Sequence, residues 1–329
     1  MTDVLVIFPA TDPVRQALAE GFGHRCRFVY KEADWPAETY REALAGAQVI
    51  LGEPKNEDFV HCRNLRWMQS PSSGVNYYVQ GGCFPRDVTL TCMTGGYGRV
   101  IAEHMVALAL SLCRRLPEYH DQQKTGTWKW IFHDKQLEDA TVLILGAGDI
   151  GTTCARFLRP MVRRIIGLRR TERPLPDCFD LAIGLDRLEE FLPQADLVLC
   201  ALPQTPDTEG LLNARRLASM KADAVLVNGG RGSLIDQDAL CELLQKGHFW
   251  GVGLDVAKPE PLPPEHPLWN QPRLILTPHA SGNTFSLESP LYRKVWAFLM
   301  ENLGRYLDGQ PLRNIVDFET GYRQPPRED

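Results

Sequence analysis

The chain has 329 residues, which is long enough for two domains of ordinary size. Its hydrophobic content of 44%, its charged content of 23% and its formal net charge of −5 are typical of a soluble globular protein and exclude a basic face for nucleic acid. No apolar run is long enough to span a membrane and the N-terminus carries no basic segment, so we expect a cytoplasmic protein without a secretory signal.

The first hundred residues alternate between strand-like and helix-like runs. A buried strand is predicted at residues 4–8, and Asp12 followed by Pro13 predicts the cap and first turn of a helix. Such alternation indicates βαβ units and a parallel sheet, and hence a separate domain. Between two strands, the small-residue loop at 70–76 suits an anion or is a plain turn. The further predicted strands are 26–30, 49–52, 65–69 and 88–92.

A long helix is predicted at residues 99–115. It is apolar over more than one face, so we expect it to be buried, in part against a second subunit. The aromatic loop at 126–130 follows it, and its residue types suit either the wall of a substrate pocket or the padding of an interface.

A glycine turn lies between two apolar strands at 142–145 and 165–168. Gly146 allows a tight turn, Gly148 lets the backbone approach a pyrophosphate, and Gly151 lets the following helix pack close to the sheet. The pyrophosphate would lie on the N-terminus of that helix, where free N–H groups favour an anion. The motif therefore predicts a dinucleotide site, the alternative being an ordinary strand-turn-helix that binds nothing.

The end of the second strand indicates which dinucleotide is bound. NAD-binding units place a carboxylate there for the ribose 2′-hydroxyl, whereas this chain has Arg169 and Arg170 and no carboxylate until Glu172. Because a guanidinium can grip a 2′-phosphate with two charge-assisted hydrogen bonds, we expect NADP(H) to be preferred, with NAD(H) possible. The alternative is that both arginines are solvated surface residues.

Polar residues follow three further predicted strands, as expected of a site at the carboxyl ends of parallel strands. Arg231 can bind a carboxylate and polarise a neighbouring carbonyl. His279 can protonate the carbonyl oxygen while a nicotinamide supplies hydride, and Glu260 would stabilise the imidazolium. Taken singly, each residue has another interpretation: Arg231 suits an ion pair, Glu260 a rigid proline turn, and His279 the end of a loop. These three strands are predicted at 224–228, 251–256 and 274–277; a further strand at 196–202 and a helix at 236–246 are also predicted.

Two further features of the sequence are the spacing of the cysteines and the C-terminal segment. The nine cysteines include no C-x-x-C pair, so we expect reduced thiols and no metal site. Ser289 and Pro290 predict the cap and first turn of a helix that runs to about residue 307, and residues 308–309 end it. The proline-rich tail at 324–329 is expected to be disordered.

These motifs resemble those of the D-isomer-specific 2-hydroxyacid dehydrogenase family over about residues 45–316. The segments that carry the resemblance are 146–151, 228–232, 255–263 and 277–282. The resemblance implies that Arg231, Glu260 and His279 are catalytic and that the amides of Ser73 and Gly74 hold the substrate carboxylate. It also implies a set of residues that bind or line the cofactor site: Gly146, Gly148, Asp149, Ile150, Gly151, Arg169, Arg170, Leu202, Pro203, Thr208, Gly229, Asp255 and Gly282.

The resemblance also implies an architecture and an activity. Two doubly wound parallel-sheet domains are expected, a Rossmann cofactor domain (98–283) inserted into a flavodoxin-like substrate domain (1–97 and 284–329). A homodimer built on the helix that starts near Gly98 is usual in the family. Two positions depart from the family pattern: Gly230 replaces an Ala and would loosen its loop, and Asn76 replaces an Asp in the substrate loop.

The resemblance to NADPH-preferring glyoxylate/hydroxypyruvate reductases implies reduction of a 2-keto acid to the D-2-hydroxy acid. Larger keto acids or a phosphonate would leave the same catalytic residues and change only the pocket walls, so the substrate side chain stays open. A rival from another class is a dinucleotide-sensing binding protein of the corepressor type, because the family includes such relatives on the same fold.

Overall fold

The computed structural model describes residues 1–170, 174–282 and 286–323, so Glu172 and the tail at 324–329 lie outside the described residues. The chain divides into two compact units. The first unit comprises Met1–Gly96 and Phe285–Asp329, and the second comprises Tyr97–Thr284. Each unit is described by itself below.

The first unit is built on a five-stranded parallel sheet with the order β2-β1-β3-β4-β5, the flavodoxin-like order. A short antiparallel ladder, β13 (Val316–Asp317) with β14 (Tyr322–Arg323), is also present. The strands are β1 (Thr2–Val6), β2 (Cys26–Tyr30), β3 (Val49–Leu51), β4 (Trp67–Gln69) and β5 (Thr89–Thr91), and the helices are α1 (Asp12–Phe22), α2 (Ala37–Gly46), α3 (Asn76–Gln80) and α10 (Pro290–Leu307).

The C-terminal helix α10 completes the first unit although it lies far away in the sequence. The predicted cap is confirmed, because the Ser289 hydroxyl accepts a hydrogen bond from the Tyr292 amide at 3.1 Å. The indole N–H of the buried Trp296 donates to the Pro9 carbonyl at 3.0 Å, and the ring packs on Phe8. Helix α10 is thereby fastened to the loop that follows β1.

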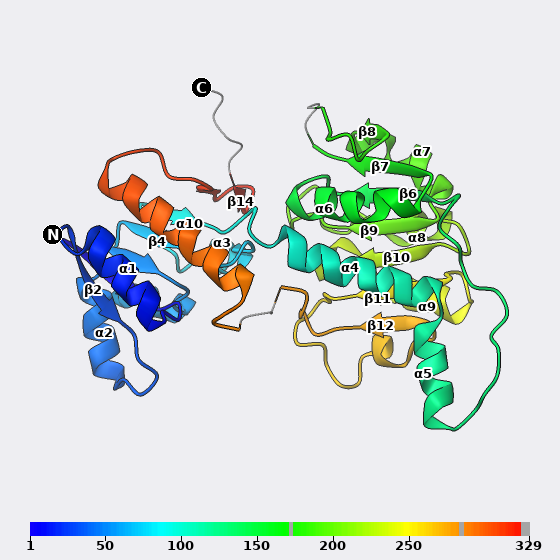
Figure 1. The fold of residues 1–329 in the computed structure, drawn as a ribbon, viewed down its shortest axis with the longest axis horizontal. Helices are drawn as coiled ribbons and strands as arrows, with labels where there is room; N and C mark the ends of the chain where they lie inside the picture. The colour runs from blue at the N-terminus through cyan, green and yellow to red at the C-terminus, as the bar shows by residue number, and fades with distance from the viewer. Residues whose placement is uncertain (171–173, 283–285, 324–329) are drawn as a thin grey trace. The chain divides into compact units, whose positions relative to one another are not determined.

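The second unit is built on a seven-stranded parallel sheet with the order β12-β11-β10-β9-β6-β7-β8. The strand order reverses between β6 and β9, which is the topological switch point at which dinucleotides bind in doubly wound sheets. The fold class predicted from the sequence, two doubly wound parallel sheets, is confirmed. The strands, all of them labelled in Figure 1, are β6 (Thr141–Leu145), β7 (Arg164–Leu168), β8 (Leu181–Ile183), β9 (Leu197–Cys200), β10 (Val225–Asn228), β11 (Gly251–Leu254) and β12 (Leu274–Leu276).

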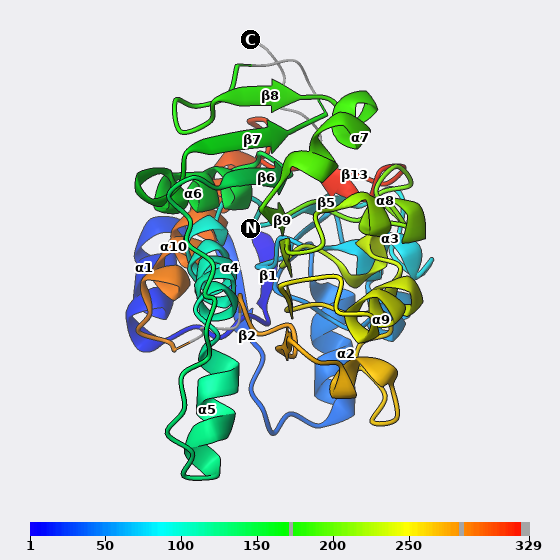
Figure 2. The same ribbon diagram turned by 90° about the vertical axis from the view of Figure 1, so that its right-hand side faces the viewer.

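Helices cover both faces of this sheet (Figure 2). Helices α4 (Gly98–Cys113) and α6 (Asp149–Leu158) lie together on one face, where α4 contacts β10 and β11. Helices α8 (Ala214–Ser219) and α9 (Gln237–Gln245) lie on the other face, and the short α7 (Leu188–Phe191) lies near the β8 edge. The apolar α4 is therefore buried largely by its own unit.

Several element boundaries differ from the prediction. Strand β1 begins and ends two residues earlier than predicted, and Thr11 rather than Asp12 is the residue preceding the first turn of α1, where it makes no side-chain capping bond. Strand β8 and helix α5 (Leu116–Lys124) were not predicted. Strand β8 has only three residues at the sheet edge, and the polar sequence of α5 has no buried face to reveal it.

All nine cysteines are free thiols, and eight of them are buried, Cys83 being exposed. Burial raises the pKa of Cys62 to about 12 and that of Cys113 to about 11. Within the described residues, no helix is both long and apolar enough to cross a bilayer, and no group of three or more His, Cys, Asp or Glu side chains is arranged to hold a metal ion.

Candidate active site

The glycine turn has the geometry that a dinucleotide requires. Gly146 has a φ of +107°, and a Cβ there would lie 2.7 Å from the Ala201 carbonyl oxygen. A Cβ on Gly151 would lie 2.0 Å from the Gly146 oxygen, whereas one on Gly148 would point into open space. The turn therefore packs tightly on the sheet side and leaves the N-terminus of α6 open on the other. These residues fit a bound pyrophosphate.

Asp149 and Ile150 form the first turn of α6, but the Asp149 carboxylate has a structural partner. Its Oδ2 accepts a hydrogen bond at 2.8 Å from the amide of Gly98, the first residue of α4. A Cβ at Gly98 would lie 2.4 Å from that carboxylate, so a larger residue there would displace the Asp149 side chain. Asp149 thus links the N-termini of the two helices on this face, a role that sequence spacing did not reveal.

The two arginines after β7 differ in their surroundings. Arg169 is partly buried, and its Nη1 donates to the Pro174 carbonyl at 3.2 Å. Arg170 is exposed. Both lie at the carboxyl end of β7, next to the glycine turn that follows β6, because β6 and β7 pair in parallel register. This is the edge at which the ribose 2′ position of a dinucleotide lies in such folds.

The loops after β9 and β11 pack against the two glycines that flank Arg231. A Cβ on Gly230 would lie 2.6 Å from the Leu202 carbonyl oxygen, and one on Gly232 would lie 2.1 Å from the Ala257 carbonyl carbon and oxygen. The Gly230 amide donates to the side chain of the buried Asn228 at 3.0 Å. The expectation that Gly230 loosens this loop is therefore wrong, because its backbone is packed and hydrogen-bonded.

Arg231 itself is partly buried, and its Nη1 donates to the Gly230 carbonyl at 2.7 Å. The side-chain amide of Asn228 donates a hydrogen bond to the Arg231 carbonyl at 2.9 Å. These bonds order the backbone and aim the side chain. The positive charge of Arg231 also acts on Glu260, so the two side chains belong to one electrostatic site.

Glu260 and His279 form a close pair. The Nδ1 atom of His279 lies 2.7 Å from Oε2 of Glu260, and the Ala257 amide donates to Oε1 at 2.9 Å. Burial alone would raise the pKa of Glu260, but the hydrogen bonds from His279 and Ala257 and the charges of His279 and Arg231 outweigh it and hold that pKa below its usual range. The side chains are 47% and 38% exposed for His279 and Glu260, so a substrate can reach them.

A buried carboxylate shapes the loop that carries His279. Asp255, which is 1% exposed, accepts hydrogen bonds from the Thr277 hydroxyl at 2.6 Å and from the amides of Ala280 at 2.8 Å and Ser281 at 3.1 Å. Its own carbonyl accepts from the His279 amide at 2.7 Å. His279 has a φ of +52°, a left-handed conformation that costs about 1–3 kcal/mol and that these bonds hold in place.

Three strands therefore bring the predicted residues together. Strands β10, β11 and β12 are neighbours in the sheet and run parallel, so the loops that carry Arg231, Glu260 and His279 leave the same edge. The Leu202–Thr208 segment follows β9 at that edge, and the Thr208 hydroxyl donates to the Pro203 carbonyl at 2.7 Å. Gly229 is buried, and a Cβ there would lie 2.7 Å from the sulfur of Met105 in α4; a Cβ on Gly282 would lie 3.4 Å from the Tyr97 ring.

The predicted carboxylate-binding loop belongs to the first unit. Ser73 and Gly74 lie between β4 and α3, and Asn76 is the first residue of α3. The loop is anchored where Ser70 donates its hydroxyl to Glu53 at 2.6 Å and accepts from the Ser72 amide at 3.1 Å.

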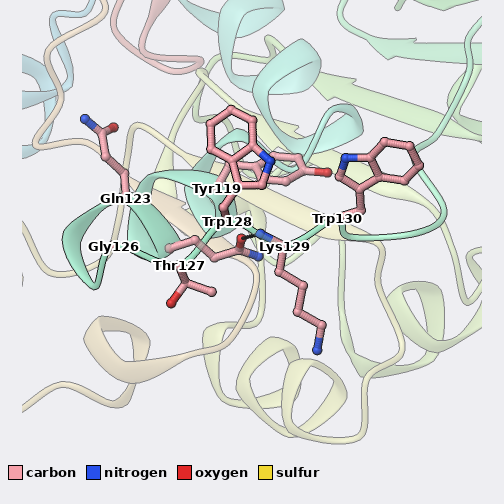
Figure 3. Close-up of a pocket in the computed structure, with 8 residues that line it drawn as sticks. Tyr119, Gln123, Gly126, Thr127, Trp128, Lys129 and Trp130 are labelled. Atoms are coloured by element: carbon pink, nitrogen blue, oxygen red, sulfur yellow. Dashed lines mark hydrogen bonds between the residues drawn. The ribbon is translucent and has the colours of Figure 1, made fainter.

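A pocket of about 640 Å³ lies on the second unit away from the Arg, Glu and His side chains. It is formed by α5 and the aromatic loop that follows, with Trp128 and Trp130 among its lining residues (Figure 3). Trp128 is 98% exposed. The other lining residues are Tyr119, Gln122, Gln123, Gly126, Thr127 and Lys129. The pocket therefore belongs to an exposed aromatic surface rather than to the site at the strand ends.

Sequence reasoning missed one residue beside the site. His104 of α4 lies 3.0 Å from the Thr277 hydroxyl through its Nε2 and 3.5 Å from Oδ1 of Asp255. The only sequence signal was a histidine within a largely apolar helix, and its partner lies 173 residues further along the chain.

Comparison with known proteins gives the family. Residues 106–281 match the model of the NAD-binding domain of the D-isomer specific 2-hydroxyacid dehydrogenases. The chain belongs to this family. It is 33% identical over 260 residues to human glyoxylate reductase/hydroxypyruvate reductase, covering 76% of this chain and 79% of the human protein.

Solved structures of the family span nearly the whole chain. A D-isomer specific 2-hydroxyacid dehydrogenase family protein from Aeromonas salmonicida is 31% identical, with 96% of this chain and 99% of that chain covered and a TM-score of 0.85. The NADPH-dependent glyoxylate/hydroxypyruvate reductase of Sinorhizobium meliloti, in complex with NADP and sulfate, is 26% identical, with 98% and 100% covered and a TM-score of 0.81. As a member of the D-2-hydroxyacid dehydrogenase family, the chain is an oxidoreductase that uses a nicotinamide cofactor and a small-molecule substrate.

Proposed function

We propose that the chain reduces a 2-keto acid of the glyoxylate/hydroxypyruvate type to the D-2-hydroxy acid with NADPH. The observation that carries this proposal is the 2.7 Å pair of His279 and Glu260 beside the charge of Arg231, at the carboxyl edge that also bears the glycine turn. The names of two relatives, the human and Sinorhizobium meliloti reductases, support the substrate class.

His279 is the proton donor in this proposal. Ionised Glu260 accepts a hydrogen bond from Nδ1–H, which orients the ring and leaves Nε2–H to protonate the substrate carbonyl oxygen. Arg231 binds the substrate carboxylate and polarises the carbonyl, so that negative charge developing on oxygen is stabilised. The nicotinamide, when bound, supplies hydride to the carbonyl carbon. The amides of Ser73 and Gly74 are proposed to bind the carboxylate as well.

The cofactor preference is proposed to be NADPH. The α6 N-terminus and the open face of Gly148 fit the pyrophosphate, and Arg170 presents an exposed cation at the end of β7 where a 2′-phosphate would lie. Arg169 lies beside it, partly buried. Leu202, Pro203 and Asp255 are proposed to line the rest of the cofactor site, with the segments 146–151, 228–232 and 277–282.

We also propose a homodimer in the cytoplasm. The segment after α4 exposes a run of aromatic side chains, with Trp128 at 98%, Trp130 at 72% and Phe132 at 71% exposure. Exposed apolar patches of this kind mark interaction sites. The base of the segment is held by Lys135, whose Nζ lies 2.7 Å from Asp223. Sedimentation of the wild type and of Trp128→Ser/Trp130→Ser tests this proposal: a dimer that the double substitution weakens supports it, and a wild-type monomer contradicts it.

The activity is tested by following nicotinamide absorbance with NADPH or NADH and with glyoxylate, hydroxypyruvate, pyruvate or phenylpyruvate. Turnover with NADPH well above NADH, giving a D product by chiral chromatography, supports the proposal, and the best substrate indicates the size of the pocket. Tight NADPH binding without turnover of any of them would overturn the reductase in favour of a dinucleotide-sensing binding protein.

A further inference from the structure

The loop that carries His279 is held by one buried carboxylate on both sides of the histidine. Before His279, the Thr277 hydroxyl donates to Asp255 Oδ1 at 2.6 Å; after it, the Ala280 amide donates to the same oxygen at 2.8 Å. The orientation of the imidazole on Glu260 therefore depends on how firmly Asp255 and Thr277 hold each other.

The hydrogen-bond partners of Thr277 determine which atom donates in its contact with His104 of helix α4. A hydroxyl has one proton, and the short bond to Asp255 uses it, because an ionised carboxylate only accepts. The remaining contact of Oγ1 is with His104 Nε2 at 3.0 Å, so the threonine oxygen accepts and His104 donates. The same Nε2 lies 3.5 Å from Asp255 Oδ1, so the imidazole also lies beside the buried carboxylate.

His104 is well placed to hold this arrangement rigidly. It lies on α4, which packs on α6 and on the strands β10 and β11. Its side chain is 26% exposed, and that of Asp255 is 0% exposed. An N–H that completes the bonding of a threonine oxygen beside a buried carboxylate orders both groups. The strands and α4 thus fix the loop after β12 from two directions.

We propose that His104 is a positioning residue for His279, acting through the chain His104 Nε2–H to Thr277 Oγ1–H to the Asp255 carboxylate. This inference rests on the proposed function, in which His279 donates the proton. His104 touches neither substrate nor cofactor in this scheme. Its loss should therefore slow the chemical step by misplacing the imidazole, and should leave the affinities for NADPH and keto acid nearly unchanged.

The test compares His104→Phe with His104→Gln, because the glutamine Nε2–H can replace the imidazole donor. His104→Phe should lower kcat about tenfold to a hundredfold, the range found when a residue that orients an active-site group is lost, with KM changing far less. His104→Gln should recover most of that loss. Thr277→Val, which also removes the bond to Asp255, should lower kcat at least as much as His104→Phe, and the double variant should be no slower than Thr277→Val alone, because both substitutions break one chain.

Two controls keep folding and function separate from the proposal. His24→Phe replaces an exposed histidine of the first unit and should leave kcat unchanged. If His104→Phe does not fold, judged by its melting temperature, Thr277→Val and Thr277→Ser carry the same comparison. An equal kcat in His104→Phe, His104→Gln and the wild type would overturn the positioning role. So would a variant in which only KM changes.

A readout independent of turnover separates this proposal from the reductase itself. The imidazole resonance of His279, assigned by its absence in His279→Gln, should move in His104→Phe and stay in place in His104→Gln. If the wild type reduces no keto acid, the proposed function fails while the resonance still decides the positioning role. If the resonance stays in place in both variants, the positioning role fails while the reductase stands.

Discussion

His279 and Glu260 face each other across 2.7 Å from loops that follow two neighbouring parallel strands. The pair exists because β11 and β12 are adjacent and because the Ala257 amide turns the carboxylate toward the histidine.

Replacing His279 by Ala should lower kcat about 10²- to 10⁴-fold, because a positioned proton donor contributes rate enhancements of that size. NADPH binding, measured by fluorescence titration, should change little, since the glycine turn is untouched. A collapse of NADPH binding alongside kcat would contradict the role of proton donor.

Replacing Glu260 by Gln should make stability less dependent on acid. The pKa of Glu260 is lower in the folded protein than its ordinary value of 4.5, so ionised Glu260 stabilises the fold above that pH and the stabilisation is lost as the pH falls through the folded pKa. The melting temperature of the wild type should therefore exceed that of the variant near neutral pH, and the gap should close on acidification. A gap that is constant with pH would show that the pair does not titrate with folding.

Replacing Arg231 by Lys tests the guanidinium fork while keeping the charge. We expect kcat/KM for the keto acid to fall about a hundredfold, as when one donor to a developing oxyanion is lost. Arg187→Lys, at the exposed ion pair with Glu190, is the matched control and should have no effect. Equal kinetics in the two variants would remove Arg231 from the site.

Replacing Arg169 and Arg170 by Ala should raise KM for NADPH about tenfold or more, the equivalent of one or two hydrogen bonds to a charged group, and change KM for NADH little. Arg163→Ala, an exposed arginine before β7, is the control. An equal effect on both cofactors would rule out a phosphate clamp at this edge.

Replacing Gly230 by Ala should destabilise the protein by about 1–3 kcal/mol, the usual cost of overpacking, because the new Cβ would lie 2.6 Å from the Leu202 carbonyl oxygen. Gly21→Ala is the matched control: its Cβ meets nothing within 4 Å on the exposed side of α1, so it should be neutral or stabilising. Urea denaturation of both variants decides between a packed and a loose loop.

Local patterns explain how much of this molecule could be predicted. The glycine turn at Gly146–Gly151 and the cap at Ser289 are encoded by residues a few positions apart, so spacing alone predicts them. Arg231, Glu260 and His279 were predictable as a set because parallel strands bring their carboxyl ends to one edge.

The rest depends on contacts between distant residues. His104 meets Thr277 across 173 residues, and the Asp149 carboxylate meets the Gly98 amide across 51, so no local periodicity marks either pair. The packing of Gly230 against Leu202 is likewise set by how two loops meet, which is why a flexible residue in the sequence turned out to be a confined one in the fold.

The burial of the cysteines allows unfolding of this protein to be followed by counting the thiols that react. Cys83 is exposed and the other eight cysteines are buried, where their thiols are protected from reagents that attack the thiolate. Brief alkylation of the folded chain should therefore add one label, and full denaturation should add nine. Intermediate masses, read after proteolysis, would show which of the two sheets opens first.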